Sequence, residues 1–319
     1  MLRTGAISAS QYERYSADFN AALASEGRLT GTRKAELTAI TVDLHDIAAA
    51  GLLTPSRLPA LFLMVERNRQ WWTTGPLLSD GDRVGFAGSE LVWEYYAGQG
   101  LQLQPLGSFG KADALFTQGT RSYPRLRALL SELIPLAAQR GGALAWEYYF
   151  SFDGGNPPWT SALSQGIALE ALSRAYLAFH QRSYLNTARR AVAIFGKSYP
   201  LGVRERTRLG SWYLLYSFAP GALVLNGFLG ALVGLWDYAY RSGDPTAWAR
   251  FAAGDREARA DVPHYDTGNW SLYQPGVPDS VDYHRLVTQF LHSLCARTHA
   301  RVYCVTAQRF DRYLAARGG

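Results

Sequence analysis

The chain has 319 residues, of which 48% are hydrophobic, 18% charged and 13% aromatic, and its formal net charge is +6. The hydrophobic share is ample for a packed core, and the low charged share excludes a disordered chain or a long coiled coil. The positive charge suits a polyanionic ligand. No dense Lys/Arg run, zinc-finger spacing or ribonucleoprotein-type aromatic motif is present, so no nucleic-acid partner is expected.

The first third of the chain predicts three helices followed by loops and short strands. Apolar residues at three- and four-residue spacing favour helices over 11–24, 33–50 and 57–68. Gly, Pro and Asp then interrupt this spacing, and they bound short runs typical of strands. These strands are expected at 83–87, 91–96 and 101–106.

From residue 111 the helical pattern returns and continues to the C-terminal region. The predicted helices cover 112–117, 121–140, 161–180, 183–198, 222–241, 245–260, 280–297 and 306–317. The stretch 221–240 is about long enough to cross a bilayer. It contains Asn226, Asp237 and several glycines, which favour a helix buried on all sides, so no membrane span is expected.

The two cysteines, Cys295 and Cys304, belong to no CxxC pair and to no cluster with metal-ligand spacing. A disulfide requires the helix that holds Cys295 to end near Thr298, and we favour two buried free thiols instead. No metal and no cofactor are expected. The N-terminal residues lack the apolar segment of a signal peptide, so the sequence leaves the localisation open, with an extracytoplasmic protein as the expectation.

An aromatic tetrapeptide, WEYY, occurs at 93–96 and again at 146–149, and a related WYLLY stands at 212–216. Each precedes a predicted helix at roughly the spacing of one helical hairpin, which is typical of an α/α toroid. We therefore predict a mainly α fold, an α/α toroid or incomplete α/α barrel, with a few short strands near 80–110 and 145–155. Residues 1–110 are expected to pack on a toroid domain formed by 111–319, as one compact unit.

Five motifs in the C-terminal half resemble, in the same order, those of the D-glucuronyl C5-epimerase family. They are PPWTSALSQGIALEALSRAYL at 157–177, SYLNTARRAV at 183–192, SWYLLYSFAPGALVLNGFLGALVGLWDY at 211–238, HYDTGNWSLY at 264–273 and VDYHRLVTQFL at 281–291. The resemblance implies an α/α-barrel fold and inversion of C5 in a glucuronate unit, which gives iduronate. The N-terminal third matches poorly, and we expect no counterpart of the family's accessory β-domains within these residues.

The family resemblance also implies which residues do the chemistry. Inversion at C5 needs two acid/base groups on opposite faces of the sugar ring and stabilisation of the negative charge on the carboxylate. Tyr283, Tyr216 and Tyr273 match tyrosines of the family site. A tyrosine serves as a base when its surroundings lower its pKa.

One position departs from the family pattern. The catalytic glutamate that precedes the tyrosine matched by Tyr216 is replaced by Leu215, which cannot move a proton. Glu94 and Glu147, one in each WEYY stretch, are the candidate substitutes, because their aromatic neighbours would raise the pKa of a carboxyl group. The candidate substrate-binding residues are His284, Asn226, Trp159, Gln165, Arg285, Lys111 and Tyr148.

Three other functions remain open beside a bacterial-type C5-epimerase. A polysaccharide lyase begins with the same deprotonation but expels the substituent at O4. A glycoside hydrolase requires two carboxylates flanking the bond, for which Glu94, Glu147, Asp153 and Asp282 are candidates. A non-catalytic glycan-binding protein is the reading that Leu215 supports. In each case the expected partner is an acidic polysaccharide or oligosaccharide, and a homodimer is also considered.

Overall fold

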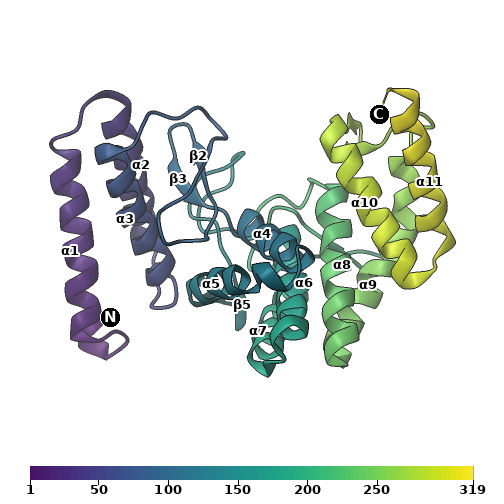
Figure 1. Ribbon diagram of the computed structural model, residues 1–319, viewed down its shortest axis with the longest axis horizontal. Helices are drawn as coiled ribbons and strands as arrows, with labels where there is room; N and C mark the ends of the chain where they lie inside the picture. Colours follow the sequence, from purple (N-terminus) through teal and green to yellow (C-terminus); the bar gives the residue numbers. More distant parts are fainter. Residues whose placement is uncertain (319) are drawn as a thin grey trace. The chain divides into compact units, whose positions relative to one another are not determined.

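The structure is a computed structural model that describes residues 1–318, and it is mainly helical (Figure 1). Within these residues it contains eleven α-helices: α1 Ala9–Glu26, α2 Gly31–Ala49, α3 Leu58–Thr74, α4 Pro105–Thr117, α5 Tyr123–Leu133, α6 Ala162–Phe179, α7 Arg182–Val192, α8 Leu225–Ser242, α9 Pro245–Asp261, α10 Val281–Thr298 and α11 Arg301–Ala316. Short 3-10 helices cover Leu2–Thr4, Thr120–Ser122, Ile134–Leu136, Ala193–Gly196 and Val262–Tyr265.

Nine short strands lie between the helices. They are β1 Arg83–Val84, β2 Trp93–Tyr96, β3 Gly100–Leu103, β4 Ala138–Arg140, β5 Ala143–Ala145, β6 Arg204–Arg206, β7 Ser211–Tyr213, β8 Leu272–Gln274 and β9 Val277–Pro278. The antiparallel pairs β2–β3, β6–β7 and β8–β9 come directly before α4, α8 and α10 in the chain, and β4 and β5 come before α6. The aromatic segments WEYY and WYLLY therefore belong to the stretches that lead into α4, α6 and α8.

The chain divides into two compact units, and each is described by itself. Unit 1 comprises residues 1–111, 124–139 and 146–159. Unit 2 comprises residues 112–123, 140–145 and the chain from 160 onward. The first segment of unit 1 ends next to the expected boundary at residue 110, and two later segments return to this unit.

Unit 1 packs a three-stranded antiparallel sheet, in the order β1–β2–β3, against helices α2 and α3. Trp93 pairs with Leu103 and Tyr95 with Leu101, so that alternate side chains face the core. The buried carboxylate of Glu36 accepts hydrogen bonds from the Tyr95 hydroxyl at 2.8 Å and from two backbone N–H groups of the β2–β3 turn. This carboxylate fixes the turn on α2.

Unit 2 contains a row of inner helices, each with an outer partner. Helix α8 packs against both α6 and α10, while α7, α9 and α11 each pack on the inner helix that precedes them in the chain. Glycines permit the close approach of α6 and α8, because a Cβ atom at Gly166 would lie 2.6 Å from the Ala231 Cα, and one at Gly234 would lie 1.9 Å from the Gly166 carbonyl oxygen. Paired inner and outer helices are the arrangement of an α/α toroid, so unit 2 forms an arc of one, and the predicted fold class is confirmed.

Helix α8 is buried along most of its length, from Leu225 to Leu235. None of the helices in the described part of the chain is both long enough and apolar enough to span a membrane. Most of the sequence 221–240 belongs to this central helix of the arc, and Gly230 and Gly234 are its contact points with neighbouring helices.

Several predicted helices have different limits in the structure. The helix predicted over 112–117 begins at Pro105, and the helix predicted over 57–68 continues to Thr74. The helix predicted over 121–140 ends at Leu133, because Pro135 lacks the backbone N–H that would continue it. The helix predicted over 183–198 ends at Val192 and continues as a 3-10 turn, and the last helix begins at Arg301 rather than Thr306. The two-residue and three-residue strands β6 to β9 were not predicted.

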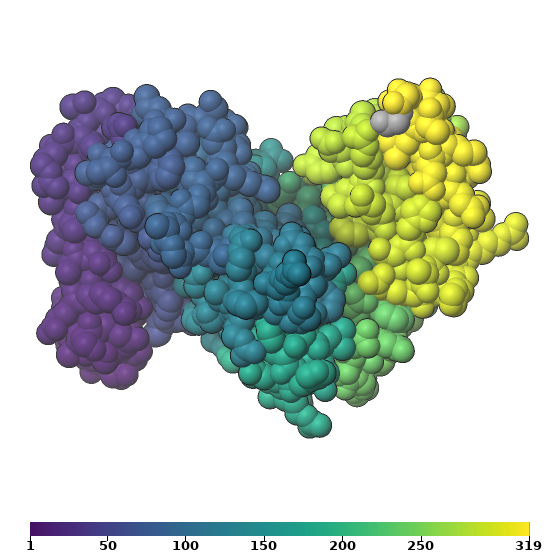
Figure 2. Space-filling view, in the orientation of Figure 1, coloured from purple at the N-terminus to yellow at the C-terminus, as the bar shows by residue number. Residues whose placement is uncertain are grey.

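The prediction of free thiols is wrong. Cys295 and Cys304 form a disulfide, with their Cα atoms 4.9 Å apart. Helix α10 ends at Thr298 and α11 begins at Arg301, so the two cysteines face each other across a tight helical hairpin. This hairpin is the yellow region of the surface in Figure 2.

Candidate active site

The inner helices of unit 2 run parallel, so their N-termini lie at one end of the arc. Gly230 of α8 packs against Leu163 of α6 and Phe290 of α10. Further along α8, Gly234 packs against Gly166 of α6 and Asp237 pairs with Arg297 of α10, so the contacts advance in the same direction along all three helices. Ser161 and Ser280, the N-cap residues of α6 and α10, each accept a backbone N–H with the side-chain oxygen. Helix N-termini carry partial positive charge, so this end of unit 2 favours an anionic group such as a carboxylate.

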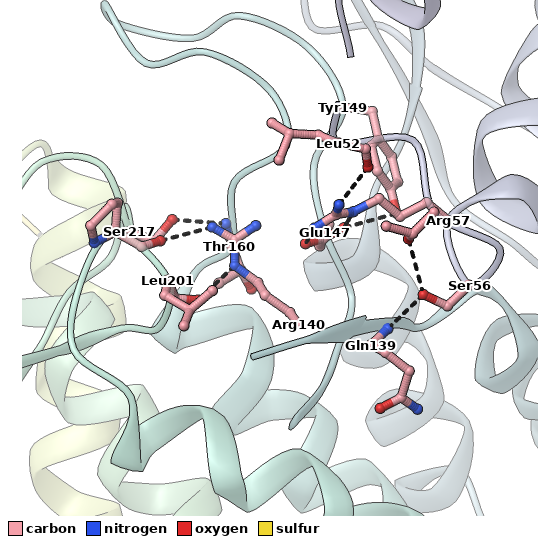
Figure 3. Close-up of polar contacts among 12 residues, drawn as sticks. Leu52, Ser56, Arg57, Gln139, Arg140, Glu147, Tyr149, Thr160, Leu201 and Ser217 are labelled. Atoms are coloured by element: carbon pink, nitrogen blue, oxygen red, sulfur yellow. Dashed lines mark hydrogen bonds and ion pairs between the residues drawn. The ribbon is translucent and has the colours of Figure 1, made fainter. Parts of the chain in front are cut away.

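Backbone pairing fixes the loop that precedes α8 against the start of α6. Thr160 and Ser217 are joined by two hydrogen bonds, from the Ser217 N–H to the Thr160 carbonyl (2.9 Å) and from the Thr160 N–H to the Ser217 hydroxyl (3.1 Å; Figure 3). The N–H of Ala162 donates to the Leu214 carbonyl at 3.0 Å. The segment that carries Tyr216 is therefore held at the N-terminus of an inner helix.

Three of the predicted tyrosines meet at this end. Tyr273 lies on β8 and Tyr283 in the first turn of α10, with ring centroids 5.1 Å apart, and the phenol of Tyr273 is hydrogen-bonded to that of Tyr216. Tyr283 is 46% exposed, whereas Tyr216 and Tyr273 are half-buried. A ligand from solvent can reach the cluster through Tyr283. We refer to these three residues as the tyrosine cluster.

The surroundings of Tyr273 favour its protonated form. Burial raises the pKa of the Tyr273 phenol well above its usual value, and the charge and hydrogen bond of Tyr216 raise it further. The lowered pKa that a tyrosine base requires is therefore not found at this residue. Tyr273 is suited to donate a proton.

Two further residues belong to the same part of the chain as Tyr216: Leu215 directly precedes it, and Asn226 lies at the start of α8. Asn226 is buried in the first turn of α8, and its Oδ1 atom has no hydrogen-bond partner among the described residues. A buried, unpaired amide oxygen is costly, and this one is closed to solvent, so Asn226 does not form part of an open ligand surface in this structure. Leu215 is buried and packs on Gly227, where it fills core space.

His284 cannot contact a ligand, contrary to its predicted role in substrate binding. Its ring is completely buried, stacks on Trp270 at 3.8 Å, and has Nδ1 2.6 Å from the Ser271 hydroxyl and Nε2 3.1 Å from the Phe310 carbonyl. Burial lowers its pKa, which keeps the ring neutral. His284 instead anchors the start of α10, including its neighbour Tyr283, to the segment that leads into β8.

The remaining predicted residues of unit 2 have supporting positions. Gln165 is buried, and its Nε2 donates to the Thr160 hydroxyl at 3.1 Å, so it braces the loop contact at Ser217. Arg285 is exposed and lies 3.5 Å from Asp282, one turn earlier on the same helix. Neither residue is part of the tyrosine cluster.

Five of the predicted residues belong to unit 1, and among them Glu147 is enclosed. The guanidinium of Arg57 donates to both carboxylate oxygens of Glu147, at 2.7 and 2.9 Å, and the Tyr149 hydroxyl donates at 3.2 Å (Figure 3). The Glu147 side chain is inaccessible to solvent. An enclosed and paired carboxylate is not poised to take a proton from a substrate.

Tyr148 and Trp159 stack on each other with ring centroids 4.2 Å apart, and both are buried. Their faces are thus used in the core of unit 1 and do not form an open platform for a sugar. Lys111 is also engaged, since its Nζ lies 2.7 Å from a carboxylate oxygen of Glu90. The hydrogen bond from Arg125, followed by the one from Lys111, lowers the pKa of Glu90 to about 2.

Glu94 is the more accessible of the two candidate glutamates. It lies on β2, 2.9 Å from Arg83, and it is hydrogen-bonded to the phenol of Tyr96 on the same face of the strand. Tyr96 was not among the predicted residues, although Glu94 and Tyr96 are two residues apart in WEYY and their side chains therefore lie on one face of the strand. Within residues 1–318, no group of three His, Cys, Asp or Glu side chains is arranged to hold a metal ion.

The fold and this end of unit 2 define a helical protein of the α/α-toroid class with a phenolic site. A family model for the C-terminus of D-glucuronyl C5-epimerases matches residues 140–312. This match covers more than half of the chain, and the chain belongs to that family.

The chain is also similar to individual proteins. The chain is 32% identical over 178 residues to a D-glucuronyl C5-epimerase of Caenorhabditis elegans, which covers 49% of this chain and 29% of that protein. It is 30% identical over 137 residues to an uncharacterised protein of Methanocaldococcus jannaschii, which covers 41% of this chain and 44% of that protein. The matched part is thus less than half the length of either relative. A GH76 α-mannanase of Bacteroides thetaiotaomicron aligns with a TM-score of 0.49 at 11% identity, over 73% of this chain and 66% of that one.

Proposed function

We propose that the chain is a C5-epimerase of a uronic-acid polysaccharide and converts glucuronate units to iduronate units. The observation that carries the proposal is the tyrosine cluster, in which Tyr216, Tyr273 and Tyr283 come from three separate segments of unit 2. Proton removal and return at one carbon require two acid/base groups close to the same ring. Three phenols at one end of the unit 2 arc supply candidates for these two groups.

The reaction has two steps: removal of a proton from C5, and delivery of a proton to the opposite face of the same carbon. A base takes the proton from C5, and the C–H electron pair delocalises into the adjacent carboxylate. A proton donated to the opposite face of C5 then re-forms the C–H bond with inverted configuration. In this proposal one of the two phenolic neighbours of Tyr273 acts as a phenolate and accepts the first proton. Tyr273, whose raised pKa keeps it protonated, then donates a proton from its hydroxyl and becomes the phenolate.

The surroundings of the cluster favour the charged intermediate. The N-termini of α6, α8 and α10 point to the same end of unit 2 and place partial positive charge there. The net charge of +6 favours encounter with an acidic polysaccharide.

A second candidate function is non-catalytic binding of the same glycan. Leu215 favours it, because it stands at the position of the family glutamate and is buried against Gly227. The enclosure of Glu147 by Arg57 leaves Glu94 as the more accessible carboxylate of the two that were considered as substitutes. The non-catalytic reading predicts binding of the glycan without any change at C5.

Incubation with a panel of uronic-acid polysaccharides in deuterated water, followed by NMR, separates these functions. The epimerase proposal predicts deuterium at C5 together with iduronate signals and no chain cleavage. A product that absorbs in the near ultraviolet would identify a lyase, and new reducing ends without a double bond would identify a hydrolase. Binding without deuterium incorporation would support the non-catalytic reading and refute the epimerase.

A further inference from the structure

A cavity of about 530 Å³ lies in unit 2 beside the turn between α8 and α9. Arg182 and Arg189 of α7 and Arg241 of α8 line it, with Tyr176 and Tyr238 among the other lining residues. We call it the arginine cavity. Its volume falls in the range of about 300–1,000 Å³ that is usual for small-molecule sites.

The three arginines are exposed, and none has a carboxylate partner within the described chain. The one carboxylate that lines the cavity belongs to Asp244, and it is already used: it accepts the Thr246 N–H at 2.8 Å and the Tyr238 hydroxyl at 3.3 Å. Three guanidinium groups face one carboxylate, so the cavity carries a local excess of positive charge.

Four helix ends border the cavity. The N-termini of α7 and α9 lie beside the C-termini of α6 and α8. Because the partial charges of N- and C-termini are opposite, the excess positive charge of the cavity comes from the three arginines. Guanidinium groups bind carboxylates and sulfates through paired hydrogen bonds.

An aromatic surface adjoins the cavity. The rings of Trp236 and Tyr240 stack at 4.8 Å, Tyr240 is 58% exposed, and the guanidinium of Arg241 lies 5.4 Å from the Tyr240 ring. Arg241 also lines a neighbouring cavity of about 270 Å³ together with Trp236. Aromatic faces beside cations suit a ligand that has both apolar sugar faces and negative charge.

We propose that the arginine cavity is a second binding site for an acidic oligosaccharide, separate from the tyrosine cluster. The cavity adjoins the C-terminal end of α8, whereas the tyrosine cluster lies beyond its N-terminal end. The eighteen residues of α8 span about 27 Å at 1.5 Å per residue. The site therefore holds a remote part of a long chain. The identity of the ligand rests on the proposed function.

The test measures binding of a glucuronate-containing octasaccharide by isothermal titration calorimetry. The variant R182Q/R189Q/R241Q removes the three charges of the cavity. The matched control, R190Q/R301Q/R312Q, removes three exposed arginines that do not line it. Loss of three exposed ion pairs predicts binding weaker by about tenfold in the cavity variant, and a change below about twofold in the control.

Two further readouts make the test specific. The octasaccharide should shift the Arg241 Nε–H resonance in 15N spectra, and its uncharged, carboxyl-reduced counterpart should not. Equal weakening in both triple variants, or no weakening in the cavity variant, overturns the proposal. Absence of octasaccharide binding to the unsubstituted protein overturns it as well.

The two proposals fail in different ways. Loss of cavity binding with normal deuterium exchange at C5 of a short substrate is the expected behaviour of the cavity variant. Octasaccharide binding at the cavity without any C5 exchange in the unsubstituted protein would refute the epimerase and leave the second site standing. C5 exchange with identical octasaccharide affinity in all three proteins would refute the second site alone.

Discussion

Arg57 holds both carboxylate oxygens of Glu147, at 2.7 and 2.9 Å, although ninety residues separate the two in the chain. The pair is buried and joins the segment before α3 to the segment 146–149 within unit 1. In the sequence, Glu147 resembles a catalytic carboxylate among aromatic rings. In the structure, its contact with the Arg57 guanidinium forms a buried ion pair that holds unit 1 together.

Substitution of Glu147 by Gln should destabilise the protein by about 3–5 kcal/mol, since removal of one partner leaves a buried charge uncompensated. Unfolding in urea measures the change. The double variant R57M/E147L should recover most of the loss, because a hydrophobic pair leaves no buried charge. Normal stability of Glu147→Gln alone would show that the pair is solvated.

The close contact of α6 and α8 leads to a second prediction about the free energy of unfolding. Gly234→Ala should destabilise the protein by about 3 kcal/mol or more, since its Cβ would lie 1.9 Å from the Gly166 carbonyl oxygen. Gly110→Ala in α4 is the control, because nothing lies within 4 Å of its added Cβ. That control should be neutral or stabilising by up to about 1 kcal/mol. Equal stability of both variants would contradict the inner-helix packing.

The Asp279 carboxyl makes the stability of the folded protein depend on pH. Burial raises its pKa to about 6 against the hydrogen bond with Ser271, which lowers it. The folded protein therefore binds this proton more tightly than the unfolded chain. The contribution to stability is fully present below about pH 4 and is lost as the pH rises through about 6.

The difference in unfolding free energy between the unsubstituted protein and Asp279→Asn isolates this group. The stability of the unsubstituted protein relative to Asp279→Asn should fall as the pH rises from 4 to 6, and it should stay constant above pH 7. A difference that grows in favour of the unsubstituted protein over the same range would mean that Asp279 is held ionised, with the opposite sign.

The disulfide closes a short loop between α10 and α11, with a sequence separation of nine residues. The chain-entropy account gives a loss of about 2–3 kcal/mol on its removal. Unfolding of C295S/C304S, compared with the oxidised protein, measures this value. A variant as stable as the oxidised protein would mean that the hairpin is held by packing alone.

The long helices were predictable because each carries several turns of apolar residues at helical spacing. Helix α6, over Ala162–Phe179, differs by about one residue at each end from the prediction of 161–180. Strands β6 to β9 have two or three residues, which is too short for an alternating pattern to appear. The end of α5 was predictable in principle from Pro135.

The candidate site was likewise predictable only in part. Tyr216, Tyr273 and Tyr283 were selected by family motif, and the structure brings them together in unit 2. The burial of His284 and the stacking of Tyr148 on Trp159 depend on contacts between segments, which sequence spacing does not reveal. The disulfide likewise depended on where α10 ends.

Deuterium incorporation at C5 of a glucuronate polysaccharide, measured by NMR for single Tyr→Phe variants, tests the central proposal most directly. Tyr216→Phe, Tyr273→Phe and Tyr283→Phe remove the three phenols, and Tyr12→Phe, which changes an exposed tyrosine of α1 in unit 1, is the control. Loss of one acid/base group predicts a rate lower by about 10²–10⁴-fold in at least two cluster variants, including Tyr273→Phe, with the control unchanged. Exchange at the full rate in all three cluster variants would contradict the account.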